Sequence, residues 1–116
     1  MKTNEQIIER WSKTEMLDGL PEDRKEMVAT SFEYLLNFLM KNDISDNGDI
    51  ESLSFPIIRR ITGVIDITND DIKNIVKEIN EQYYEYNTFD EKLYENDKEL
   101  AFCTEFSEKK INEMKK

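Results

Sequence analysis

The sequence predicts an all-α fold, a small bundle of about five helices around one long central helix, with no substantial sheet. Through most of the chain, apolar residues recur at the spacing of one helix face. Turn-forming residues around Gly19, Gly48 and Gly63 divide the chain into pieces of helix length. We therefore expect residues 1–116 to form a single helical domain, with a frayed C-terminal tail over residues 108–116.

The first half of the chain contains the long helix. Thr3 and Gln6 have the spacing of a capping box, so a short helix is expected to begin near Asn4. Pro21 suits the first turn of a new helix, which we expect to run to about Lys41. Its apolar side chains are Met27, Val28, Phe32, Tyr34, Leu35, Leu36, Phe38, Leu39 and Met40. Because they cover more than one face, this helix is either central to the fold or covered by a partner.

Three further helical regions are predicted in the second half. A short helix is expected over residues 55–62, with Ser54 as its cap and Gly63 as its end. Residues 64–67 are brief and extended, too short to build a sheet alone. Thr68 or Asn69 is expected to cap a helix over about residues 70–86.

A second capping box, formed by Thr88 and Glu91, is expected to start the final helix or pair of helices.

The composition argues against an enzyme. The chain has no histidine, which removes the usual general base for a serine or cysteine nucleophile and the commonest transition-metal ligand. The single cysteine, Cys103, lies in an apolar run and is expected to be a small buried hydrophobe. The carboxylates are abundant, but none stands in an apolar setting that would raise its pKa. We therefore expect neither catalysis nor a bound cofactor.

Charge and hydropathy limit the partners. The chain has 26 acidic and 16 basic residues, giving a net charge of −10. Binding to a nucleic-acid backbone needs local basic density, and the only adjacent arginines are Arg59 and Arg60. No apolar stretch approaches the length of a membrane span, and the N-terminus does not resemble a secretory signal. We expect protein partners, with no direct contact to nucleic acid or membrane.

Four side chains are candidates for partner binding: Trp11, Phe38, Arg59 and Arg60. Trp11 is either an anchor for a partner or the residue that pins the first helix onto the long one. Phe38 widens the apolar stripe of the long helix. The two arginines, on a short apolar helix, either reach acidic groups of a neighbouring subunit or pair with carboxylates of this chain. The expected partners are subunits of a larger assembly or a second copy of the chain.

Residues 43–54, DISDNGDIESLS, resemble a degenerate calcium-hand loop. Asp43, Ser45 and Asn47 fall at loop positions 1, 3 and 5, with a glycine at position 6. Asp49 adds a nearby carboxylate, so these four residues are the candidate metal ligands. Ser54 stands at position 12, where a calcium hand has a glutamate that supplies two oxygens. The alternative is that the same residues form a polar turn between helices.

Residues 7–61 resemble the N-terminal segment of major capsid proteins of T-even-type contractile-tailed phages. The matching positions in order are Arg10, Trp11, Lys13, Thr14, Leu17, Gly19 and Leu20, followed by the run Phe55, Pro56, Ile57, Ile58, Arg59 and Arg60. The resemblance implies a small virion or capsid-associated protein, found in the virion or the host cytoplasm, whose arm-like segment contacts neighbouring subunits.

The function expected from the sequence is therefore that of a non-enzymatic structural or assembly protein of a phage particle, acting through helix-mediated contacts. Two alternatives stay open. The first is a regulatory protein of the calcium-hand type, for which Ca²⁺ would be the ligand. The second is an acidic inhibitor that mimics nucleic acid.

Overall fold

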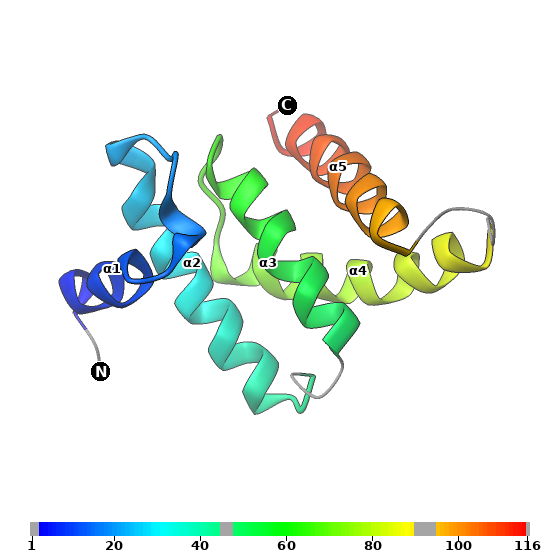
Figure 1. Ribbon diagram of the computed structural model, residues 1–116, viewed down its shortest axis with the longest axis horizontal. Helices are drawn as coiled ribbons and strands as arrows, with labels where there is room; N and C mark the ends of the chain where they lie inside the picture. The colour runs from blue at the N-terminus through cyan, green and yellow to red at the C-terminus, as the bar shows by residue number, and fades with distance from the viewer. Residues whose placement is uncertain (1–2, 45–47, 90–94, 116) are drawn as a thin grey trace.

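The computed structural model describes residues 3–44, 48–89 and 95–115 of the chain (Figure 1). Its elements in order are α1 (Asn4–Ser12), the single 3₁₀ turn η1 (Glu15–Leu17), α2 (Glu22–Lys41), α3 (Gly48–Thr62), α4 (Asn69–Phe89) and α5 (Glu95–Met114). No strand occurs in these ranges, so the all-α prediction is confirmed. Helix α5 continues to Met114, through most of the segment predicted to be a frayed tail.

Two helix starts follow from side-chain caps that the sequence predicted. At α1, the Thr3 hydroxyl accepts a 3.2 Å hydrogen bond from the Gln6 amide, and the Thr3 amide donates a 2.9 Å bond to the Gln6 side chain. At α4, the cap is Thr68 and not Asn69, the other candidate: Thr68 and Asp71 form the same reciprocal pair, at 3.1 and 2.8 Å. Each pair satisfies amide groups that a helix start leaves without intrahelical partners.

Helix α3 begins seven residues earlier than predicted, at Gly48, so the expectation that Ser54 caps it is wrong. Ser54 lies inside the helix, where its buried hydroxyl donates a 2.6 Å hydrogen bond to the carbonyl of Ile50. Pro56 is also inside the helix, although it cannot donate to the preceding turn. Ile50, Leu53 and Ile57 are all buried, so core packing outweighs the local break that these residues suggest.

The predicted start of the last helix is also wrong. Helix α4 extends to Phe89, so Thr88 lies within α4 and does not cap α5. Glu91, the other half of that predicted capping box, lies outside the described residues. Near this end of α4, Tyr83 packs edge-on against Phe102 of α5, with ring centroids 5.4 Å apart. This contact between helices stabilises α4 beyond what its own sequence pattern indicates.

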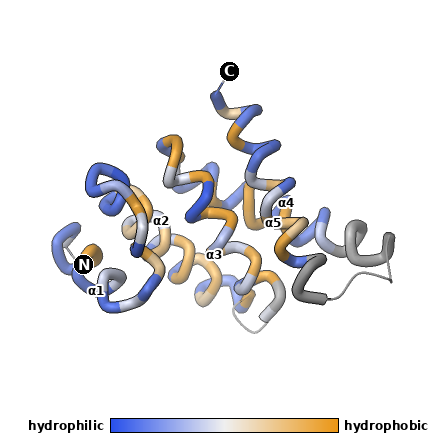
Figure 2. Tube along the Cα trace, turned by 45° about the horizontal axis from the view of Figure 1, so that its top comes forward, coloured by the Kyte–Doolittle hydropathy of each residue, from blue (hydrophilic) through white to orange (hydrophobic). Residues whose placement is uncertain are grey.

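The centre of the fold is shared by two helices. Helix α2 packs against α1, η1, α3 and α4, while α3 packs against α2, α4 and α5. Figure 1 shows α3 lying between α2 and α5. Hydrophobic residues gather along α2 and α3, whereas α1 is mostly hydrophilic (Figure 2). The largest fully buried side chains are Val28, Phe32, Leu35, Leu39, Ile50, Leu53, Ile57, Ile58, Ile61, Ile72, Ile75 and Ile79.

None of the helices in the described ranges combines the length and the apolarity that crossing a bilayer requires.

Candidate functional site

Trp11 occupies the interior of the fold. Its side chain is only 7% exposed and packs against Phe32 of α2 and Phe55 of α3, with ring centroids 5.2 and 5.9 Å apart. Its indole nitrogen donates a 2.9 Å hydrogen bond to Glu33. Of the two interpretations from the sequence, this geometry matches the one in which Trp11 pins the first helix onto the long one.

The two arginines of α3 have different surroundings. Arg59 donates hydrogen bonds from Nε to the carbonyl of Met16 (2.9 Å) and from a terminal nitrogen to the carbonyl of Asp18 (2.6 Å). Its guanidinium therefore holds the turn around η1. Arg60 is exposed and donates a 3.0 Å bond to the hydroxyl of Thr104 on α5. Within the described ranges, neither arginine forms an ion pair with a carboxylate.

The calcium-hand candidates are only partly described. Asp43 is exposed and has a left-handed backbone, with φ of 57°. Ser45 and Asn47 lie outside the described residues, as does the side chain of Asp49. Ser54, which stands where a calcium hand places its glutamate, is buried within α3. In the described part of the chain, no group of three or more acidic, cysteine or histidine side chains is placed to hold a metal. Calcium binding thus stays a prediction.

Cys103 is buried, as the sequence predicted. Burial raises the pKa of its thiol above the ordinary value of 9.0; the charge of Arg60 opposes this shift and that of Glu99 adds to it. A thiol that is inaccessible and held in its neutral form is a poor nucleophile.

Phe38 lies beside a groove at the C-terminal end of α2. Its ring is partly buried and stacks on Tyr34, with centroids 6.3 Å apart and planes 11° from parallel. Two adjoining hollows, of about 520 and 400 Å³, share Phe38, Asn42 and Lys73. We call their union the Phe38 groove; it is lined by Tyr34, Asn37, Phe38, Lys41, Asn42, Asp43, Ile44, Ile50, Lys73, Asn74, Val76, Lys77 and Asn80.

The groove combines an apolar floor with a polar rim. Aromatic and aliphatic carbons come from α2, from the turn after it and from the buried faces of α3 and α4. Exposed lysine and asparagine side chains stand around them. This mixture is typical of ligand and peptide sites, in which apolar surface provides affinity and a few polar groups fix orientation. Of these lining residues, the sequence identified Phe38 as a candidate for partner binding and Asp43 as a candidate metal ligand. The other walls come together only when α4 packs against α2.

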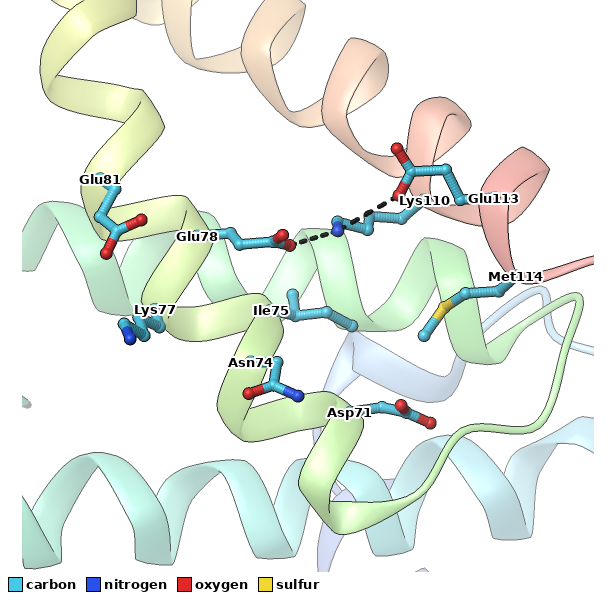
Figure 3. Close-up of a pocket in the computed structure, with 9 residues that line it drawn as sticks. All are labelled: Asp71, Asn74, Ile75, Lys77, Glu78, Glu81, Lys110, Glu113 and Met114. Atoms are coloured by element: carbon cyan, nitrogen blue, oxygen red, sulfur yellow. Dashed lines mark ion pairs between the residues drawn. The ribbon is translucent and has the colours of Figure 1, made fainter.

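Another hollow, of about 450 Å³, lies between α4 and α5 (Figure 3). Lys110 points into it between two carboxylates, forming an ion pair with Glu78 and another with Glu113 at 3.3 Å. Burial lowers the pKa of Lys110, but hydrogen bonds and charge from both glutamates outweigh burial, so the pKa is raised above its usual 10.5. The lysine therefore links α4 to α5 and gives this hollow a structural explanation.

Comparison of the chain with protein-family models, with curated proteins and with solved structures finds no match.

Proposed function

We propose that this protein is a non-enzymatic assembly component of a phage particle and that it acts through protein–protein contacts at the Phe38 groove. The observation that carries the proposal is the groove itself. It places Phe38, the one predicted partner-binding residue that neither sits in the core nor holds another part of the chain, beside an open hollow of about 520 Å³. Apolar surface left open in this way is typical of interaction sites.

The choice of a phage particle rests on the sequence. Residues 7–61 resemble the opening of T-even-type capsid proteins, and their described part folds as most of α1, η1, α2 and most of α3. Phe38 belongs to this segment. The absence of histidine and the burial of Cys103 support a non-enzymatic role, since both remove common nucleophile chemistry.

The test is sedimentation of the full-length tagged chain from cells that produce it naturally. We expect the wild-type chain in fast-sedimenting fractions together with a particle. Phe38→Glu should move the chain to the slow fractions, because a charge in the apolar groove is costly to bury. Met40→Glu is the matched control: Met40 is 59% exposed on the same helix and does not line the groove.

Two further arms of this experiment separate the alternatives. Repeating it with a calcium chelator should change nothing, and release of the chain by chelator would favour the calcium-hand function. Adding DNA fragments should also change nothing, and displacement by DNA would favour the nucleic-acid mimic. A wild-type chain that sediments only as a free small protein would refute the assembly role.

A further inference from the structure

Three exposed lysines stand on the rim of the Phe38 groove. Lys41 lies at the end of α2, and Lys73 and Lys77 lie on α4. All three side chains are exposed, and among the lining residues that the structure describes the one acidic residue is Asp43; Asp46 and the side chain of Asp49 lie outside the described residues. The described lining of the groove therefore has more basic than acidic side chains, in a chain whose net charge is −10.

These three lysines are unpaired in the described part of the chain. Lys13, Lys25 and Lys110 all form ion pairs with glutamates. Lys41, Lys73 and Lys77 form none, although the chain has 26 acidic residues. Lys73 and Lys77 are also four residues apart on one helix, a spacing at which like charges repel and weaken the helix slightly. A carboxylate from another molecule would relieve that repulsion.

The floor between the lysines is apolar. Phe38 and Ile44 line the floor and are partly buried, and Ile50 and Val76 line it and are buried. The phosphate backbone of a nucleic acid would contact the lysines but would gain nothing from the aliphatic side chains of this floor. A peptide with apolar and acidic side chains would use both.

Four asparagines complete the site. Asn37, Asn42, Asn74 and Asn80 are all exposed on the groove. An amide side chain both donates and accepts hydrogen bonds, which suits the alternating groups of a peptide backbone. Asn42 donates one bond of 2.9 Å to the carbonyl of Phe38, which fixes its side chain at the groove.

We propose that the Phe38 groove binds an acidic, apolar segment of a partner protein, with apolar side chains on the Phe38 floor and carboxylates beside Lys41, Lys73 and Lys77. This inference rests on the proposed function, since it names the chemistry of the partner that the groove recognises.

The experiment is selection of displayed random peptides on the immobilised full-length chain, followed by affinity measurement on the enriched peptides. We expect enriched peptides that combine Asp or Glu with Leu, Ile, Phe or Trp. Replacing both α4 lysines, as Lys73→Glu with Lys77→Glu, should weaken their binding about tenfold or more. Phe38→Ala should also weaken it, and rising salt should weaken it because the rim charges are exposed.

The matched control is the double variant Lys109→Glu with Lys115→Glu. Both residues are exposed and unpaired on α5, away from the groove, and the change in net charge is identical. Equal loss in the two double variants would show a general charge effect and overturn the proposal. Urea unfolding of each variant confirms that the fold is intact.

Three other results would overturn the proposed partner chemistry. The first is enrichment of basic or uncharged peptides, or failure to enrich any peptide whose binding depends on the groove residues. The second is self-association of the chain through Phe38, which would make a second copy the occupant. The third is displacement of the peptides by a single-stranded oligonucleotide. If the chain still sediments with a particle in a Phe38-dependent manner, the proposed function stands and only the partner chemistry fails.

Discussion

The indole nitrogen of Trp11 and the carboxylate of Glu33 form a buried hydrogen bond of 2.9 Å between α1 and α2. The same carboxylate accepts two bonds from Arg10, at 2.8 and 3.1 Å. Glu33 is only 8% exposed, so its charge is held inside the fold by these two donors. This arrangement attaches the short, mostly hydrophilic α1 to the long helix.

Removing the Glu33 carboxylate should therefore destabilise the protein. Glu33→Ala leaves the Trp11 N–H without its acceptor and Arg10 without its ion pair, which we expect to lower the free energy of unfolding by about 2–3 kcal/mol. Urea denaturation followed by Trp11 fluorescence measures this change. Glu9→Ala is the control, because Glu9 is exposed and its ion pair with Lys13 is long, at 3.9 Å. This substitution should change the free energy of unfolding by less than about 0.5 kcal/mol. Equal effects would contradict the role assigned to Glu33.

The neighbouring arginines of α3 should respond differently to mutation. Arg59→Ala breaks two hydrogen bonds to the carbonyls of Met16 and Asp18, and should cost about 1–2 kcal/mol. Arg59→Lys should recover only part of this, since one ammonium cannot reproduce the fork of the guanidinium. Arg60→Ala removes one exposed contact with Thr104 and should cost less than about 0.5 kcal/mol. Thermal and urea unfolding of the three variants test this order, and a larger loss for Arg60→Ala would reverse our assignment.

Lys110 should contribute a pH-dependent stability. Its pKa is raised in the folded protein, so the folded state holds the proton more tightly than the unfolded state. The stabilisation is fully present at neutral pH and is lost as the pH rises above 10.5 through the raised pKa. We expect wild type to exceed Lys110→Met by about 1 kcal/mol at neutral pH, with the difference shrinking in alkali. Lys109→Met, which changes an exposed neighbour, should show no such trend. If the difference in stability between wild type and Lys110→Met stays constant with pH, the ion pairs of Lys110 are not its source.

Cys103 should react slowly while the protein is folded. It is 5% exposed, and burial raises the pKa of its thiol, so little thiolate is available to attack. We expect modification by a colorimetric disulfide reagent at neutral pH to be at least about tenfold slower than in urea. Reaction at equal rates in the two conditions would show that the α3–α5 contact opens readily. The rate of Cys103 modification in Glu33→Ala, a variant destabilised far from Cys103, shows whether the reaction proceeds through global unfolding.

The sequence by itself determined the helical class and most helix bounds. Local chemistry was sufficient for the starts at Thr3 and Thr68, because a capping box is formed entirely by residues three positions apart. The long helix was predictable because its apolar spacing persists over several turns. The burial of Cys103 followed from its apolar neighbours. For each of these, the determining contacts lie within a few residues of each other in the chain.

Only the tertiary structure decided the start of α3 and the composition of the groove. Ser54 and Pro56 suggest a helix boundary, but α3 continues through both residues because Ile50 and Leu53, which precede them, are buried in the core. The groove brings Phe38 beside Lys73 and Lys77, which are more than thirty positions away in the chain. No local pattern encodes that proximity, because it arises from how α4 packs against α2.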